Sequence, residues 1–502
     1  MRSSTSLLFF VLVILGGIVA CSPGVSSPQG FEPLRGARDT QTPSPIGHIV
    51  VIVQENRSFD NLFATFPGAN GTMVGLAEAM PSPTASFCAQ NGQPVITQPT
   101  TVPLTEVSLV GKGFPNDWDE DQDLAHDRPH GYLGDCDAGG TGSQSPPNAS
   151  HPCAMDGFDL SYTGPDGSGS KLSHPTCTYT YQYVNPKDIQ PYWDMARQYV
   201  LADNTFQTQG SESFTAHQDL IAGGTAINDY ESVIDDPTAF PWGCDAPPGA
   251  HTSLITTAGK YLKNKGPWPC FTYATVRDLL DAKTVPWKYY AVKVAGASAG
   301  IWNAFDAIKA VRHSSEWGTN VSWPPTNVFN DIQDGTLAAV SWITPDGPNS
   351  DHPAILNPKT NKPEDKGPSW VASIVNAIGQ SNYWDSTAIV VLWDDWGGFY
   401  DHVPPPLYDD QGGLGFRIPM IIISPYVKAH VDHTQYETAS ILRFIENNWN
   451  LGSLNEEDAR ARSIGNAFDF KQAPRPFKVI HSIYSKSFFL REKPSGIPPD
   501  TE

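Results

Sequence analysis

The sequence has few basic residues. Its 502 residues include 32 Lys and Arg against 53 Asp and Glu, which gives a formal charge of −21. Proteins that bind nucleic acid use Lys and Arg to neutralise phosphate groups. The charge balance therefore excludes nucleic acid as an expected partner, whereas a cation held among carboxylates remains compatible with it.

The sequence also lacks a hydrophobic run long enough for a comfortable transmembrane helix, which needs about 20 residues. The apolar run at residues 7–20 follows Arg2 and ends in Ala20. This pattern predicts a signal peptide over residues 1–20 and export, with an uncleaved membrane anchor as the alternative. Because the run is followed at once by Cys21, as in a bacterial lipobox, we expect a lipid there as the only membrane link. Ordinary cleavage after Ala20 would instead release a secreted protein.

No two cysteines have the C-x-x-C spacing of a zinc site. The chain has seven cysteines, and six remain once Cys21 is set aside as the lipid carrier. In an exported protein this even number predicts three disulfides, whose pairing the sequence leaves open. Cys136–Cys153 and Cys244–Cys270 are attractive pairs because each closes a short loop.

After the signal peptide, composition divides the chain into three parts. Residues 21–44 are rich in Ser and Pro and predict a flexible spacer, and residues 491–502 predict a frayed tail. The interval 45–490 is expected to be a single domain. Within it, residues 80–180 contain four cysteines and little periodicity. They predict a long loop-rich insertion.

Short apolar runs alternate with helical patterns in the rest of the chain. Strands are expected at 48–53, 288–294, 337–343, 388–393 and 419–423, and helices at 370–379 and 440–449. This alternation predicts an α/β fold with a mostly parallel central sheet, helices on both faces and a disulfide-bearing insertion.

Two polar pairs follow predicted strands directly, where α/β proteins place functional groups. Glu55 and Asn56 can offer oxygen to a hard cation, although a strand-ending turn is the favoured explanation when this pair is taken alone. Asp394 and Asp395 repel each other and therefore need a cation or hydrogen-bond donors. The aromatic residues around them argue against a solvated acidic turn, so we favour a metal site.

Ser213 is a candidate nucleophile, because a metal or a base can activate a serine hydroxyl. It can also serve as the N-cap of the following helix. The histidines beside turn residues or acids are candidates for phosphate contact or leaving-group protonation, or are idle exposed residues: His130, His217, His352 and His402.

Residues 296–300 match G-x-S-x-G, the nucleophile elbow of carboxylesterases, with Ser298 at its centre. The motif counts only with a strand before it and a helix after it, and the helix has little support here. We retain a serine carboxylesterase using Ser298 as an alternative.

Several long blocks resemble a bacterial phosphoesterase family. The family contains phosphatidylcholine-type phospholipase C and the respiratory-burst-inhibiting acid phosphatase, and it belongs to the alkaline phosphatase superfamily. The resemblance is carried by residues 48–60, 341–353, 393–406 and 415–425 in this order. It implies an alkaline-phosphatase-like fold and hydrolysis of a phosphate ester.

The resemblance to the acid phosphatase branch also implies residue roles. One divalent cation is expected on Glu55, Asn56, Ser213, Asp394 and Asp395. Ser213 is expected to form a phosphoserine intermediate. His130 and His352 are expected to contact phosphate oxygens or the leaving group, and His217 ranks lower as a substrate-binding residue.

Two departures from the family pattern bear on these roles. The stretch around Ser213 lacks the Gly-Pro-Thr segment of phospholipase C members, which leaves Ser211 and Thr215 as close rivals. Trp396 stands where those members have His after an acidic pair. Both differences favour the phosphatase-like branch. The alternatives are a phospholipase C-type phosphodiesterase and a non-catalytic anchored binding protein.

Overall fold

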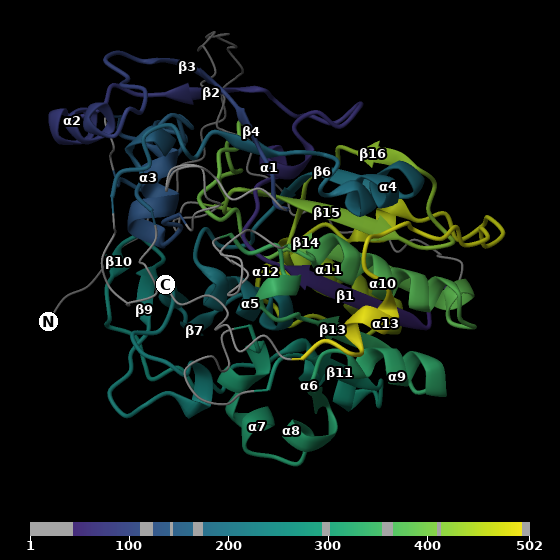
Figure 1. Cartoon of the computed structure of the whole chain (residues 1–502). Coiled ribbons are helices and arrows are strands. Elements are labelled where there is room, and N and C mark those ends of the chain that lie inside the picture. Colours follow the sequence, from purple (N-terminus) through teal and green to yellow (C-terminus); the bar gives the residue numbers. More distant parts are fainter. Residues whose placement is uncertain are drawn as a thin grey trace, which may run out of the picture. The chain divides into compact units, whose positions relative to one another are not determined.

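A nine-stranded sheet built from aliphatic runs lies at the centre of the fold (Figure 1). The computed structural model describes residues 44–110, 124–140, 144–163, 174–293, 302–353, 365–408 and 413–493. The sheet order is β12 (Val321–Ser322), β11 (Trp287–Tyr290), β13 (Val340–Ile343), β1 (His48–Gln54), β14 (Thr387–Trp393), β15 (Arg417–Ile423), β6 (Val200–Phe206) and β16 (His430–Asp432), with β17 (Tyr436–Glu437) also paired to β6.

The sheet is mostly parallel. β1 runs parallel to both β13 and β14, and only β15 runs antiparallel to its neighbours. Since β15 lies between β14 and β6, two reversals give β6 the direction of β1. The carboxyl ends of β1, β6, β13 and β14 therefore meet at one edge of the sheet.

Both faces of the central strands are covered. All seven residues of β14 and of β15 are buried, although successive side chains point to opposite faces. One group of helices contains α4 (Gln190–Gln198), α9 (Asn327–Asp334), α10 (Gly367–Gly379) and α13 (Lys486–Phe489), and a second contains α5 (Ser213–Ala222), α6 (Val276–Ala282), α11 (Ala439–Trp449) and α12 (Glu457–Arg460). This arrangement confirms the predicted α/β class.

The remaining elements are short. The other helices are α1 (Phe59–Phe63), α2 (Ser82–Gln90), α3 (Leu133–Cys136), α7 (Lys309–Arg312) and α8 (Glu316–Thr319). Three small sheets pair β2 (Val74–Ala77) with β3 (Thr100–Pro103), β4 (Thr105–Val107) with β5 (Gln182–Val184), and β7 (Ala226–Asn228) through β8 (Glu231–Ile234), β9 (Ser253–Thr256) and β10 (Tyr261–Leu262).

The disulfide-bearing insertion has an apolar core of its own. This core includes Tyr132, Phe158 and Tyr181, and it extends to Trp396 and Tyr400, which follow β14. The insertion is thereby packed on the loop that carries the acidic pair.

Three disulfides join the six expected cysteines: Cys88–Cys177, Cys136–Cys153 and Cys244–Cys270. The two short-loop pairs proposed from the sequence are both present. Cys88 and Cys177 are 89 positions apart in the sequence, and their disulfide links α2 covalently to the segment before β5.

One strand was missed by the sequence interpretation. Residues 202–209 carry no regular apolar pattern, yet residues up to Phe206 belong to β6, a buried strand inside the sheet. Asp203 interrupts its apolar run. This carboxylate is 1% exposed and accepts a hydrogen bond from the Asn70 N–H at 2.7 Å, which explains a polar residue at this position.

The described residues contain no helix that is both long and apolar enough to cross a membrane. The expected signal peptide, Cys21 and nearly all of the spacer lie outside the described residues, as does most of the tail. Their assignments stay predictions.

Candidate active site

The two polar pairs meet at the carboxyl edge of the sheet. Gln54 and Trp393 are partners at the ends of the parallel strands β1 and β14, so the residues after them lie side by side. The Asn56 N–H donates to Asp394 Oδ1 at 3.0 Å, and the Arg57 N–H donates to the Asp395 carbonyl at 3.1 Å. Parallel pairing thus converts two distant sequence motifs into one cluster.

The carboxylates of this cluster are fully buried. Glu55 and Asp395 are 0% exposed and Asp394 is 1% exposed. Asp395 Oδ1 accepts the Gly397 N–H at 2.7 Å, whereas Asp394 Oδ2 accepts no hydrogen bond. Buried carboxylates in such proximity need positive charge or donors to remain ionised.

Ser213 is brought into this cluster by α5, of which it is the first residue. Its Oγ lies 3.4 Å from Asn56 Oδ1 and 3.4 Å from Asp395 Oδ2. The position before the helix is taken by Glu212, so the alternative N-cap role of Ser213 is wrong. The rival Ser211 is engaged elsewhere, because its hydroxyl donates to Asp235 Oδ1 at 3.0 Å.

His217 lies one turn after Ser213 on the same face of α5. Its Nε2 is 3.0 Å from Glu55 Oε1 and 3.7 Å from Asp394 Oδ2. Together with these two acids it forms a buried group whose ligand atoms all lie within 4.8 Å of one another. The structure therefore places His217 beside the expected metal ligands, although the sequence ranked it as a lower substrate-binding candidate.

His126 is a further member of the cluster that the sequence interpretation left out of its site. Its Nε2 lies 3.1 Å from Asn56 Nδ2 and 3.6 Å from Asp395 Oδ2. Its Nδ1 lies 2.7 Å from the Leu124 carbonyl, which favours a proton on Nδ1 and a lone pair on Nε2. The sequence signal was weak, because His126 precedes an insertion loop and follows no predicted strand.

The backbone of the loop after β14 comes very close to Asn56. Asn56 itself has a φ of 56°, a left-handed conformation that Asn tolerates better than most residues. Gly397 has a φ of +61°, and a Cβ there would lie 2.3 Å from the Asn56 carbonyl oxygen. Gly397 therefore permits a close approach of the loop after β14 to Asn56, which carries the amide ligand.

Two of the three remaining candidate histidines, His130 and His352, have different surroundings. His130 belongs to the π-helical turn Arg128–Tyr132, and its side chain is 35% exposed. Its Nδ1 lies 2.7 Å from Asp127 Oδ2, a hydrogen bond that raises the pKa of His130. His352 is 6% exposed, and its Nδ1 lies 2.6 Å from the Pro353 carbonyl.

The loop that contains His352 follows β13 and reaches the same edge of the sheet. The Ser350 carbonyl accepts the Glu55 N–H at 2.8 Å. This contact brings the backbone of that loop to the cluster.

His402 belongs to a different network. Its Nδ1 lies 2.6 Å from Asp60 Oδ2, and Arg417 donates to both Asp60 and Asp401 in a fully buried arrangement. The guanidinium supplies the positive charge that these acids require, so this group is structural.

The residues present fit a divalent cation. Three carboxylates, an amide oxygen, a hydroxyl and the His217 imidazole converge in a buried place, and one carboxylate oxygen there accepts no hydrogen bond. Oxygen donors with imidazole suit a divalent metal of the first transition row as well as a harder ion.

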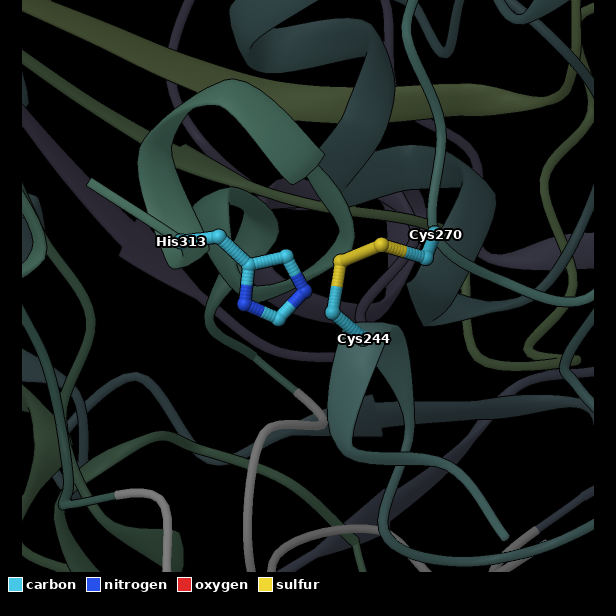
Figure 2. Close-up of side chains that lie close together, drawn as sticks. All are labelled: Cys244, Cys270 and His313. Atoms are coloured by element: carbon cyan, nitrogen blue, oxygen red, sulfur yellow. A yellow bond between two sulfur atoms is a disulfide. The ribbon is translucent and has the colours of Figure 1, made fainter. Parts of the chain in front are cut away.

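A second candidate group does not fit a metal. Cys244, Cys270 and His313 lie together, but Figure 2 shows the two sulfur atoms bonded to each other beside the imidazole. A disulfide has no thiolate to offer. The G-x-S-x-G serine, Ser298, lies outside the described residues.

A profile of the phosphoesterase family matches residues 46–452. A non-hemolytic phospholipase C of Pseudomonas aeruginosa is 24% identical over 93% of this chain, and the match covers 64% of that protein. A phospholipase C B of Mycobacterium tuberculosis is 25% identical over 86% of this chain and 79% of that protein. The chain spans less than two thirds of the length of the Pseudomonas relative.

A solved structure of a protein in the alkaline phosphatase superfamily from Vibrio parahaemolyticus is similar at 12% identity and a TM-score of 0.30, over 54% of this chain and 63% of that one. The family profile covers the sheet and every residue of the acidic cluster. The resemblance drawn from the sequence is thereby confirmed, and the chain belongs to the phosphoesterase family.

Proposed function

We propose that this protein is a metal-dependent hydrolase of phosphoric esters that uses Ser213 as its nucleophile. The observation that carries the proposal is the position of the Ser213 hydroxyl, 3.4 Å from both Asn56 and Asp395 inside a buried group of acids. Family membership supports the reaction class. The acid-phosphatase-like assignment and export remain part of the proposal.

The proposed cation is held by Glu55, Asn56, Ser213, Asp394 and Asp395, and the structure adds His217 as a neighbour of two of them. When bound, such a metal lowers the pKa of a coordinated hydroxyl and neutralises charge on phosphate oxygens. Three buried acids near Ser213 would otherwise oppose an anionic substrate.

The chain's own groups account for the covalent steps. Ser213 Oγ forms a bond to phosphorus as the bond from phosphorus to the leaving oxygen breaks, which produces phosphoserine. Asp395 Oδ2 is placed to accept the hydroxyl proton. Water then attacks the phosphorus and releases phosphate and the free serine. His130, whose pKa is raised by its hydrogen bond to Asp127, is proposed to donate a proton to the leaving oxygen.

His352 is proposed to contact phosphate oxygens. Its loop touches Glu55 through the Ser350 carbonyl, and its ring lies 5.8 Å from the ring of Trp302. Packing against a large buried ring holds an imidazole in one orientation, as a phosphate contact requires.

A phosphodiesterase of the phospholipase C type is the second candidate. The relatives from Pseudomonas and Mycobacterium are named phospholipases C and align over most of this chain. The same nucleophile and cation can serve monoesters and diesters, so the choice depends on the leaving group that the site accepts.

The test is hydrolysis of p-nitrophenyl phosphate, bis-p-nitrophenyl phosphate and phosphatidylcholine before and after chelation. We expect turnover that is lost on chelation and restored by a divalent cation. The preferred ester distinguishes phosphatase from phospholipase C. Chelator-resistant cleavage of a carboxylic ester would instead favour Ser298. Retained metal with no turnover of any ester would favour a binding protein.

A further inference from the structure

The first turn of α5 is capped by a residue from another segment. The opening N–H groups of a helix have no partner inside the helix, and the side chain of the preceding residue usually supplies one. Glu212 holds that preceding position in α5, but its side chain makes no capping hydrogen bond. The Phe214 N–H donates instead to Asp236 Oδ1 at 3.1 Å, across 22 positions of the sequence. Asp236 therefore acts as a helix cap supplied from outside the helix.

Asp236 also holds the residue on the other side of Ser213. The Asp236 N–H donates to Glu212 Oε2 at 2.8 Å. Glu212 and Phe214 are the two chain neighbours of Ser213, and each is hydrogen-bonded to Asp236. One bond uses the Asp236 carboxylate as acceptor and the other uses its N–H as donor. The backbone is thus held immediately before and immediately after the candidate nucleophile.

This external cap leaves the Ser213 hydroxyl available to the candidate active site. Serine hydroxyls near helix starts readily bond the N–H groups of their own helix. In this structure Ser213 Oγ lies 3.4 Å from an oxygen of Asn56 and 3.4 Å from an oxygen of Asp395. Because the Asp236 carboxylate accepts the Phe214 N–H, this donor does not compete for the hydroxyl.

The segment that contains Asp236 is itself fixed in place. Asp235 has a φ of 59°, a left-handed conformation that bends the chain directly after β8. Asp235 Oδ1 accepts the Arg128 N–H at 2.8 Å. Arg128 begins the turn that carries His130, the proposed acid. The bend after β8 therefore connects the start of α5 to that turn.

The ring of Phe214 is held independently of its N–H. The ring centroid lies 5.7 Å from that of Trp242 and 6.1 Å from that of Phe271, and the residue is 2% exposed. These aromatic contacts hold the side chain, while Asp236 holds the main chain. Phe214 thus gives the adjacent Ser213 a fixed direction.

We propose that Asp236 is a positioning residue that sets the geometry from which Ser213 attacks phosphorus. The inference rests on the proposed function, in which Ser213 is the nucleophile. Misplacement of a reacting atom by about 1 Å can cost about 10²-fold in rate. Asp236 acts through the main chain on both sides of Ser213, so its loss lowers kcat more than it raises KM.

The test compares Asp236→Ala with Asp236→Asn in the full chain. Alanine removes the acceptor of the Phe214 N–H, whereas asparagine keeps an oxygen at that place. The substrate is the p-nitrophenyl ester that the unsubstituted chain prefers, with a divalent cation present. We expect Asp236→Ala to lower kcat by about 10²-fold and to change KM by less than about threefold. Asp236→Asn should restore most of the lost rate.

Ser211→Ala is the matched control. Ser211 joins the same two segments through two hydrogen bonds with Asp235, at 3.0 and 2.7 Å. Its replacement removes both of these bonds but leaves the neighbours of Ser213 bonded to Asp236. We expect Ser211→Ala to keep its kcat although its Tm falls. A merely structural role of Asp236 predicts instead that the two alanine variants retain the same kcat.

Amide hydrogen exchange provides a measurement that needs no turnover. Peptides that contain residues 213–217 are expected to exchange at least about tenfold faster in Asp236→Ala than in the unsubstituted chain, because the Phe214 N–H loses its acceptor. Ser211→Ala should leave the exchange of these peptides unchanged.

Glu212→Ala is a second variant should Asp236→Ala fail to fold, because it removes the acceptor of the Asp236 N–H. It should also lower kcat, and Glu212→Gln should keep it. The proposal would be overturned by a kcat within about twofold of the unsubstituted value in the folded alanine variants, or by an equal loss in Ser211→Ala. Faster exchange in a chain that hydrolyses no ester would count against the proposed function alone. Hydrolysis with unchanged kcat in these variants would count against the positioning role alone.

Discussion

His217 Nε2 lies 3.0 Å from Glu55 Oε1, although the two residues are 162 positions apart in the chain. His217 and Ser213 are one helical turn apart, so α5 places a hydroxyl and an imidazole at the same edge of the sheet. Glu55 lies at this edge because it directly follows β1. A single helix that faces two parallel strand ends therefore assembles the candidate site.

Replacing Ser213 by Ala is expected to reduce kcat on the order of 10⁴-fold or more, because the covalent step loses its nucleophile. Far-UV circular dichroism should be unchanged, since the contacts of the hydroxyl with Asn56 and Asp395 are long, at 3.4 Å. Ser211→Ala is the matched control, as its hydroxyl is bonded to Asp235 instead. Full activity in Ser213→Ala would refute the nucleophile assignment.

Replacing His217 by Gln is expected to weaken binding of the catalytic metal by about 10–100-fold, whether the imidazole binds the metal or orients Glu55. Competition with a chelator measures the affinity. His313→Gln, an exposed histidine beside a disulfide, should leave the metal affinity unaltered. An unchanged affinity in His217→Gln would show that this residue only packs against the acids.

Replacing Asp127 by Asn is expected to move the alkaline limb of the kcat profile to lower pH. The Asp127 hydrogen bond raises the pKa of His130 above 6.5, so the wild-type imidazole keeps its proton to higher pH. Asn retains the oxygen that accepts the N–H groups of His130 and Gly131 but removes the charge. Without that charge, His130 loses the proton that it donates to the leaving group at a lower pH.

The matched variant for this prediction is His130→Gln. It should lower kcat by about 10²–10⁴-fold and abolish the alkaline limb of the pH profile. The pH profile is recorded with a saturating alkyl phosphate, whose alkoxide leaving group needs a proton, and with p-nitrophenyl phosphate, whose leaving group needs none. An alkaline limb at the same pH in Asp127→Asn would contradict the assignment of His130 as the acid.

Replacing Gly397 by Ala is expected to lower the free energy of unfolding by about 1–3 kcal/mol and to weaken metal binding. A φ of +61° strains any side chain, and the new Cβ would meet the Asn56 carbonyl at 2.3 Å. Gly335→Ala separates these effects. Gly335 has a φ of +76°, and a Cβ there would meet no atom within 4 Å. The Gly335→Ala protein should therefore lose stability through backbone strain alone and keep its metal affinity. Equal losses in the two variants would exclude a clash at Asn56.

Much of the fold was predictable because local patterns and tertiary packing agree. The runs that became β1, β14 and β15 are continuous in aliphatic residues, as strands buried on both faces must be. β6 was not predictable in this way, since Asp203 breaks its run and is satisfied by the distant Asn70. The direction of β15 was likewise open, because an apolar run does not reveal which way its strand runs.

Local sequence is enough to identify the candidate groups: the acids that directly follow buried strands, the serine at a helix start, and the motif order that marks the family. Which of these groups meet depends on the tertiary structure. Only folding places His217 and His126 at the acids and pairs Cys88 with Cys177. These contacts join segments tens to hundreds of residues apart, and no local periodicity encodes such a distance.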